Sequence, residues 1–145
     1  MRWNNPRWVK LIVNKLTIKQ SSYFFPRYGE IYLVYFNPKR GNEVGKLRPS
    51  LVISNDIQNE YDHHIIVAPL SDEDWGNLVE VQHFEVLIRA NATNGLNKDS
   101  KILLNRVRAI DKKLRLRSYC GVASQGIMEQ VNRSLELVLN MKKRF

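Results

Sequence analysis

The chain has 145 residues, of which 43% are hydrophobic, and this is enough for one domain with a buried core. Its net charge of +9 favours a polyanionic partner such as nucleic acid, and its single cysteine, Cys120, excludes an internal disulfide framework. No apolar run approaches membrane-spanning length and residues 1–7 lack the apolar core of a secretion signal, so we expect no membrane association and a cytoplasmic location.

Charge is segregated along the sequence. Residues 1–27 contain six Lys or Arg and no acid, whereas residues 49–88 contain eight acids and no Lys or Arg. A second basic region follows at 101–117. This pattern predicts a positive face set against a negative one, and nucleic acid is the favoured partner. Solvated charge without a single target is the alternative.

Residues 1–27 are predicted to be a basic N-terminal extension to a domain at 28–145. The apolar residues of the extension fall at helical spacing, although Val9, Val13 and Ile18 interrupt the stripe; they are Trp8, Leu11, Ile12 and Leu16. Pro26 marks the end of this segment and a domain boundary.

The first half of the domain is predicted to be strands joined by polar turns. The aromatic and β-branched run at 29–36 indicates a strand, and a loop at 37–47 separates it from a short buried strand at 49–53. Asn55 is expected to cap a helical turn that reaches Gln58. Two more strands are predicted at 64–70 and 79–88.

The second half is predicted to contain two strands and a terminal helix. A turn at 91–95 precedes a strand at 102–110, and a short strand follows at 119–123. Ser124 is a suitable helix N-cap. The apolar stripe of the helix is Met128, Val131, Leu135 and Val138, and Lys142 to Arg144 lie at its carboxyl end. Short strands with few crossover helices predict a mainly β (α+β) fold with a small, curled antiparallel sheet.

The segment from Gly41 to Asp56 is the most informative part of the chain. Gly41 and Gly45 bound a loop that can change conformation, and Arg48 stands just before the rigid Pro49 at the start of a strand. A guanidinium stays charged and binds two oxygens at once. An arginine fixed beside a mobile loop therefore suits the binding of a phosphate.

These residue types are compatible with cleavage of RNA through its own 2′-hydroxyl, a reaction that needs neither a metal nor a protein nucleophile. The site must orient the attack in line and stabilise negative charge on the phosphorus. Arg48 suits the second task, and Ser71, at the end of the strand at 64–70, could hydrogen-bond a phosphate oxygen or relay a proton. The residues alone leave open a structural salt bridge for Arg48 and a turn cap for Ser71.

Other chemistries have weaker support in the sequence. Asp72 to Asp74 follow a strand end and have no histidine at ligand spacing, so a solvated turn is favoured over a metal site. His63 and His64 are adjacent and would point to opposite faces of a strand. Cys120 is expected to be a small buried residue. The three tryptophans could stack bases, but packing is the simpler interpretation; they are Trp3, Trp8 and Trp75.

From about Arg27 to Leu139 the chain resembles the MazF/PemK family of toxin endoribonucleases. The resemblance depends on ordered blocks at compatible spacing. These blocks are Tyr28 to Tyr32, Asn37-Pro38 with Gly41 to Gly45 and Arg48-Pro49, Val52 to Asp56, Val67 to Ser71, Gly95-Leu96, and Asp99 to Leu104 with Arg108 to Lys112.

The resemblance implies an SH3-like small barrel of antiparallel strands with a C-terminal helix, and a homodimer. It implies a toxin of a type II toxin–antitoxin system that cleaves single-stranded RNA at short sequences without a metal or other cofactor, leaving a 2′,3′-cyclic phosphate and a 5′-hydroxyl. A cognate antitoxin would occupy the RNA groove. By position, Arg48 and Ser71 would be catalytic, and RNA would be bound by Asn42, Glu43, Gly45, Lys46, Arg106 and Arg108.

The chain departs from the family pattern at two site positions. The family usually has Thr where this chain has Ser71, and Gln where it has Arg106. The second change affects a position that reads bases or steadies the site, so base preference is open. Two other functions also remain: a gyrase poison on the same barrel, against which Arg48 argues, and a catalytically inactive nucleic-acid-binding or regulatory homologue.

Overall fold

The structure is a computed structural model that describes residues 25–43, 45–72 and 80–141. The predicted helical extension lies outside these residues except for its last three positions, as do Lys142 to Arg144 and the three tryptophans. No helix in the described ranges has the length and apolar character needed to cross a membrane.

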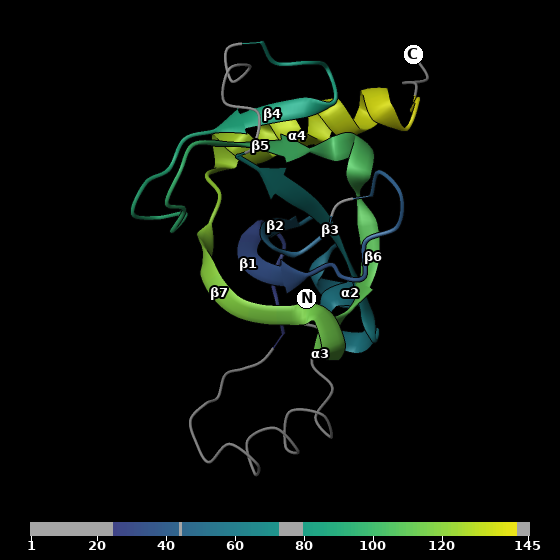
Figure 1. Ribbon diagram of the computed structural model, residues 1–145. Helices are drawn as coiled ribbons and strands as arrows, with labels where there is room; N and C mark the ends of the chain where they lie inside the picture. Colours follow the sequence, from purple (N-terminus) through teal and green to yellow (C-terminus); the bar gives the residue numbers. More distant parts are fainter. Residues whose placement is uncertain (1–24, 44, 73–79, 142–145) are drawn as a thin grey trace.

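A single antiparallel sheet organises the chain (Figure 1). Its strands follow the order β4-β5-β3-β2-β1-β7, and β6 pairs with β3 as well. The strands are β1 (Glu30–Tyr35), β2 (Leu47–Val52), β3 (His64–Ser71), β4 (Glu85–Ile88), β5 (Ser100–Leu103), β6 (Arg108–Asp111) and β7 (Leu116–Val122). The sheet curls around its own interior, so the predicted small antiparallel barrel-like fold is confirmed.

The helices lie at opposite ends of the sheet. The C-terminal helix α4 (Gln125–Val138) packs against β4 and the 3-10 turn η2 (Leu104–Arg106), whereas α2 (Asp56–Tyr61) and α3 (Lys112–Arg115) lie at the other end (Figure 1). Both predicted caps are confirmed. Asn55 Oδ1 accepts the Gln58 N–H at 2.9 Å, and Ser124 Oγ accepts the Ile127 N–H at 3.2 Å.

The prediction of one strand at 102–110 is wrong. Here the chain forms β5, then the turn η2, then β6. The alternating side chains belong to two different cores, because Ile102 and Leu104 pack in one cluster and Ile110 packs in the other. A straight strand could not serve both clusters, so the chain bends at η2, and Arg106 lies at the bend.

The prediction of a strand at 79–88 is too long. Residue 79 lies outside the described residues, and only β4 is extended. A turn precedes β4, in which the Glu85 N–H donates to the Gln82 carbonyl at 2.9 Å and the Gln82 N–H donates to Glu85 Oε1 at 3.1 Å. The side-chain oxygen of Glu85 satisfies a backbone donor at this turn, which stabilises the bend.

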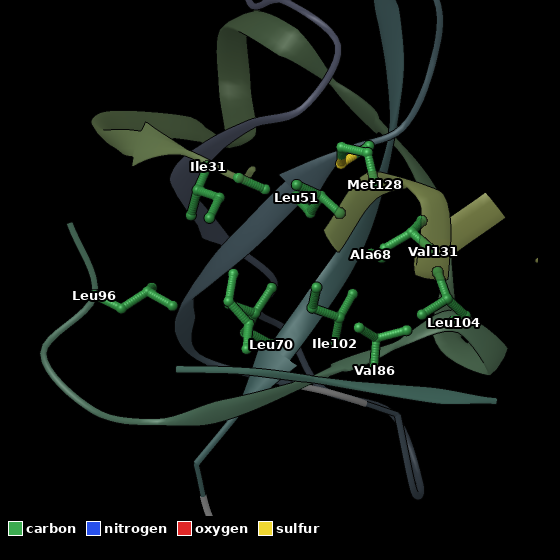
Figure 2. Close-up of a cluster of buried hydrophobic side chains, with 12 residues drawn as sticks. Ile31, Leu51, Ala68, Leu70, Val86, Leu96, Ile102, Leu104, Met128 and Val131 are labelled. Atoms are coloured by element: carbon green, nitrogen blue, oxygen red, sulfur yellow. The ribbon is translucent and has the colours of Figure 1, made fainter. Parts of the chain in front are cut away.

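Two apolar clusters lie on opposite faces of the central strands. The larger one joins the sheet to α4 and contains Leu51, Leu70, Ile102 and Val131, with Met128 from the first turns of the helix (Figure 2). The smaller one contains Val34, Phe36, Val52, Val67 and Ile110. Consecutive residues of β2 and β3 therefore point alternately into the two clusters, as expected for a strand.

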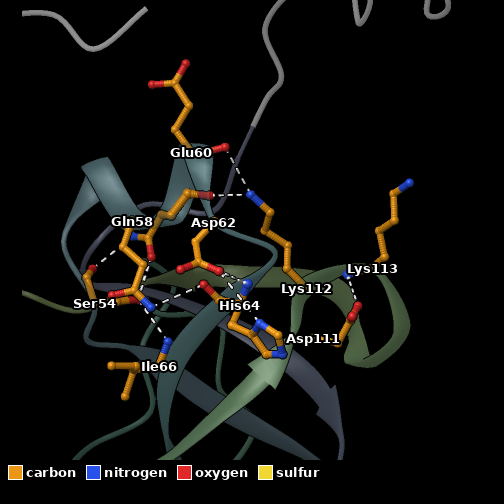
Figure 3. A network of polar contacts seen from close by, with 10 residues as sticks. Ser54, Gln58, Glu60, Asp62, His64, Ile66, Asp111, Lys112 and Lys113 are labelled. Atoms are coloured by element: carbon orange, nitrogen blue, oxygen red, sulfur yellow. Dashed lines mark hydrogen bonds and ion pairs between the residues drawn. The ribbon is translucent and has the colours of Figure 1, made fainter. Parts of the chain in front are cut away.

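A polar network closes the end of the sheet at α2 and β6 (Figure 3). Ser54 Oγ accepts the Ile66 N–H at 2.9 Å, and Lys112 Nζ donates to the carbonyls of Asn59 and Glu60 at 2.6 and 3.2 Å. Burial lowers the pKa of Lys112, although nearby Asp62 and Glu60 oppose that shift. The network ties α2 to the start of α3.

Candidate functional site

Arg48 and Ser71 lie on adjacent antiparallel strands. The β2–β3 pairs are Ser50 with Pro69, Leu51 with Ala68 and Val52 with Val67, so each step back along β2 matches one step forward along β3. Continued to the ends of both strands, this register sets Arg48 opposite Ser71. Directly opposite residues of an antiparallel pair share a face of the sheet. The sequence prediction that these two residues belong together is therefore supported by the strand register.

The strand start predicted at Pro49 lies slightly earlier, so Arg48 is inside β2. Arg48 pairs with Val34 of β1, which fixes its backbone on one side. Pro49 has no N–H to donate, and the β2–β3 pairs begin at the next residue. The backbone of Arg48 is thus held by β1, while its β3 side opens toward Ser71.

The Arg48 side chain is half-buried and lines a pocket of about 400 Å³. Its Nε donates to the Gly45 carbonyl at 3.1 Å, which anchors the guanidinium to the end of the loop. The pocket also contains Lys46, Leu47, Lys98 and Asp72, and Lys98 Nζ lies 3.8 Å from Asp72 Oδ2. Among the residues that the structure describes, the lining has three cations and one carboxylate, which suits an anionic group. We call it the Arg48 pocket.

A second pocket, of about 680 Å³, holds four of the predicted RNA-binding residues. Its lining is Phe36, Asn42, Glu43, Pro69, Asn105, Arg106, Val107 and Arg108. Arg108 Cζ lies 5.5 Å from the centre of the Phe36 ring, and Arg106 Nη1 donates to the Asn42 carbonyl at 3.3 Å. We call it the Arg106 pocket, and it combines a buried aromatic ring beneath it with two exposed or half-exposed guanidinium groups.

The loop at 37–47 contributes to both pockets. Asn42 and Glu43 line the Arg106 pocket, whereas Lys46 lines the Arg48 pocket. The base of the loop is closed by the Lys46 N–H, which donates to Asn37 Oδ1 at 2.8 Å, and by the Phe36 N–H, which donates to the Lys46 carbonyl at 2.8 Å. The loop therefore leaves and rejoins the sheet at one fixed place between the two pockets.

The two glycines of the loop have different structural roles. Gly41 has φ +56 with open space around it, which fits the predicted conformational freedom. Gly45 is packed, because a Cβ there would lie 2.8 Å from the Cβ of Lys39. Close packing against Lys39, rather than a hinge, explains the second glycine.

The remaining candidates lie apart from this arrangement or have structural roles. His63 and His64 are both exposed, and His64 Nδ1 lies 3.6 Å from Asp62. Cys120 lines the Arg48 pocket, and desolvation raises the pKa of its thiol. In the described ranges, no three His, Cys, Asp or Glu side chains gather as a metal site would require.

Two contributors to the site were not predicted from the sequence. Phe36, only 1% exposed, is the buried aromatic residue beneath the Arg106 pocket, and Lys101 is the β5 partner of Ser71. Lys101 Nζ lies 3.0 Å from Glu85 Oε1 and donates to the Glu80 carbonyl at 2.8 Å, with only 6% of its side chain exposed. A lysine directly before the apolar run at 102–104 was the signal in the sequence for this buried pair.

Known protein families and individual proteins match most of the chain in sequence. The profile of the PemK-like, MazF-like toxins of type II toxin–antitoxin systems matches residues 27–139. The chain is 34% identical over 116 residues to Endoribonuclease MazF of Staphylococcus epidermidis, covering 79% of this chain and 92% of that protein. Endoribonuclease MazF of Staphylococcus saprophyticus is 33% identical over 118 residues, with the same two coverages.

Solved structures share the fold at lower sequence identity. MazF from Deinococcus radiodurans superposes with a TM-score of 0.67 at 23% identity, covering 82% of this chain and all of that chain. A mycobacterial endoribonuclease in complex with its cognate antitoxin superposes with a TM-score of 0.65 at 16% identity, covering 82% of this chain and 99% of that chain.

Proposed function

The chain belongs to the family of PemK-like, MazF-like toxins of type II toxin–antitoxin systems, and we propose that it is a sequence-selective endoribonuclease that cleaves single-stranded RNA. The observation that carries this proposal is the placement of Arg48, in a cation-rich pocket and opposite Ser71 in the β2–β3 register. The relatives over 79% of the chain are themselves endoribonucleases by name.

In the proposed reaction the RNA provides its own nucleophile. The 2′-oxygen attacks the adjacent phosphorus, the bond from phosphorus to the 5′-oxygen breaks, and the products carry a 2′,3′-cyclic phosphate and a 5′-hydroxyl. The proton lost from the 2′-hydroxyl is balanced by the one gained by the leaving oxygen. The protein must orient the phosphate and stabilise the charge that develops on it.

Arg48 is proposed to stabilise the phosphorane charge. A guanidinium cannot give up its proton near neutral pH, so its contribution is electrostatic rather than that of a proton shuttle. Ser71 is proposed to donate a hydrogen bond to a phosphate oxygen or to help relay the proton. Its short side chain on the end of β3 faces the same side of the sheet as Arg48.

The bases on one side of the cleaved bond are proposed to occupy the Arg106 pocket. Arg106 and Arg108 would contact base edges or phosphates there, with Asn42 and Glu43 from the loop. Gly45 accepts the bond from Arg48 Nε, and Lys46 lines the Arg48 pocket, so both would contact RNA on that side. Arg106 offers donors only, whereas the glutamine usual in the family offers a donor and an acceptor. Base preference in this pocket should therefore shift toward bases that present acceptors, such as guanine.

The same function implies partners and a location. We propose a cytoplasmic homodimer that is neutralised by a cognate antitoxin, as the mycobacterial structure is a toxin with its own antitoxin. An acidic antitoxin segment would compete with RNA for the cation-rich pockets. The basic extension at 1–27 remains, in this proposal, an appendage to the toxin domain at 28–145.

The test is to incubate the purified protein with single-stranded RNA in EDTA and to map the ends of the products. We expect discrete cuts with 2′,3′-cyclic phosphate and 5′-hydroxyl ends, and no cuts with Arg48→Ala. Intact RNA would contradict the proposal. RNA that is bound but not cut would instead favour an inactive nucleic-acid-binding homologue, and inhibition of DNA supercoiling without RNA cleavage would favour a gyrase poison.

A further inference from the structure

An exposed tyrosine and an exposed arginine stack on each other at the edge of the Arg48 pocket. Arg117 Cζ, from β7, lies 5.3 Å from the centre of the Tyr35 ring, at the end of β1. Tyr35 is 39% exposed and its partner in β2, Leu47, is 49% exposed. We call Tyr35, Leu47 and Arg117 the platform.

The positive charge of the platform has no carboxylate partner among the residues that the structure describes. Arg117 Nη1 donates to the Leu114 carbonyl at 2.6 Å, and the neighbouring Arg115 Nη1 donates to the carbonyls of Tyr35 and Asn37 at 3.0 and 2.8 Å. Carbonyl acceptors fix a guanidinium without neutralising it. The Arg115 bonds also hold the end of β1 in place, so the Tyr35 ring is presented from a rigid backbone.

The platform is continuous with the Arg48 pocket. Leu47 belongs to both, and it directly precedes Arg48 in β2. Tyr35 is opposite Leu47 in the β1–β2 ladder, so these two side chains share one face of the sheet; Arg48 alternates to the other face, although Leu47 and Arg48 both line the pocket. Leu33, which precedes Tyr35 on the same face of β1, also lines the pocket.

We propose that the platform binds single-stranded RNA next to the cleaved phosphate, with a base stacked on Tyr35 and the adjoining phosphate paired with Arg117. This inference rests on the proposed function. An aromatic ring accepts the face of any base, and a cation beside it neutralises the backbone, so the platform would lengthen the RNA contact without adding sequence preference. The Arg106 pocket would then read bases on one side of the cut, and the platform would hold the other side.

The charge of the platform favours RNA over the other occupants of an exposed apolar and aromatic patch. A second copy of this chain has the same arginine and a net charge of +9, so it would be repelled. RNA instead has a negatively charged phosphate at every nucleotide. Three side chains also form a small contact compared with a stable protein interface, which buries about 800 Å² on each partner.

Binding of 2′-fluoro RNA, which lacks the attacking hydroxyl, tests the platform without cleavage. Fluorescence anisotropy would compare oligomers of about 5 and about 15 nucleotides, a range that spans known single-strand sites. We expect Tyr35→Leu to weaken binding of the longer oligomer about fivefold or more, and Tyr35→Phe to retain it, because the ring is the stacking group. Arg117→Gln should make the salt dependence shallower by about 0.7 in the log–log slope, the value for one phosphate contact.

Two matched controls are present in the chain. Tyr28 has the same 39% exposure as Tyr35 but stands before the start of β1 and bonds to Asn132 of α4. Arg133 is an exposed arginine on α4. Tyr28→Leu and Arg133→Gln should bind both oligomers as the wild type does.

Three results would overturn the inference. They are Tyr35→Leu binding the longer RNA as tightly as Tyr28→Leu does, an unchanged salt slope in Arg117→Gln, or a loss of binding in Tyr35→Leu that is accompanied by a change of oligomeric state in light scattering. The last result would make the platform an interface between copies. Absence of any RNA cleavage by the wild-type protein would instead defeat the proposed function itself, so the two failures are distinguishable.

Discussion

Arg48 of β2 and Ser71 of β3 occupy opposite positions in one antiparallel register, although they are 23 residues apart in the sequence. Ser71 ends β3 and Arg48 is the second residue of β2, beyond the last β2–β3 pair, and both residues are half-buried. This relationship turns two unremarkable residues into one candidate site, because a phosphate placed between them could be contacted by both.

Replacing Arg48 should abolish most of the RNA cleavage. We expect Arg48→Ala to lower the single-turnover rate by about 100- to 1000-fold, the loss typical when a donor to a developing anion is removed. Arg48→Lys should recover only part of that loss, because a lysine keeps the charge but cannot bind two oxygens in a fixed geometry. Gel analysis of a labelled RNA measures both rates, with Arg133→Ala as the control. A rate for Arg48→Ala equal to that of the control would remove Arg48 from the mechanism.

Ser71 should matter through its hydroxyl group alone. We predict that Ser71→Ala slows cleavage by about tenfold to 100-fold, since a hydrogen bond to the reacting phosphate is lost. Ser71→Thr keeps the hydroxyl and has the residue usual in the family, so its rate should stay within about threefold of the wild type. The comparison uses saturating RNA, which separates the chemical step from binding. Equal rates for the alanine and threonine variants would show that the hydroxyl has no part in the reaction.

The strands that carry the site could be predicted from the sequence because their signals are local. Arg48-Pro49 marks a strand start, and polar residues after Leu70 mark a strand end. The register that sets Arg48 opposite Ser71 depends on pairing across the sheet, which no local pattern encodes. The bend at η2 was missed for a related reason. The alternation at 102–110 is regular, and only the existence of two cores shows that its two halves point into different clusters.

The two pockets, like the strand register, could not be predicted from the sequence. Asn42, Glu43, Arg106 and Arg108 were expected to bind RNA, and the structure brings all four to one pocket, because the loop at 37–47 folds toward η2 and Arg106 donates to the Asn42 carbonyl. Their separation from Arg48 depends on which way the loop crosses the end of the sheet. That path is fixed by the bonds of Lys46 and Asn37 at its base.

The thiol of Cys120 should react slowly in the folded protein. Desolvation raises its pKa above the ordinary value of 9.0, although a backbone hydrogen bond involving Leu33 opposes the shift, so the thiolate is scarcer in the native state than in the unfolded chain. We expect alkylation by iodoacetamide near pH 8 to be slower in buffer than in urea, and to be slower still with 2′-fluoro RNA bound, because Cys120 lines the Arg48 pocket. An equal rate with and without RNA would place the substrate elsewhere.

The raised pKa of Cys120 also makes the stability of the protein depend on pH, and its direction can be predicted. Above 9.0 the unfolded chain loses the Cys120 proton first, while the native state still holds it, so the native state binds more protons. The free energy of unfolding should therefore fall as the pH rises from 9.0 through the native pKa. Cys120→Ala should lack this component, and urea titrations of both proteins across that range would measure the difference. A steeper fall in the alanine variant would contradict the sign.

The buried pair of Lys101 and Glu85 should be important for stability, because both charges are shielded from water. Their side chains are only 6% and 14% exposed, and the ammonium also bonds the Glu80 carbonyl. Lys101→Met would leave the Glu85 carboxylate without its cation, at a cost of about 3–5 kcal/mol in the free energy of unfolding. The double variant Lys101→Met with Glu85→Leu should recover much of that loss, since an apolar pair of similar volume removes both desolvation penalties.

An exposed ion pair provides the control for that prediction. Arg89 Nη1 lies 3.0 Å from Asp99 Oδ2 with 74% of the arginine side chain exposed, so Arg89→Ala should cost no more than about 1 kcal/mol. Urea unfolding of the four proteins measures these differences. Because Lys101 is the β5 partner of Ser71, a loosened β5 should also slow RNA cleavage in Lys101→Met, and the double variant should regain rate as it regains stability. Equal stability losses for Lys101→Met and Arg89→Ala would mean that burial gives the inner pair no special weight.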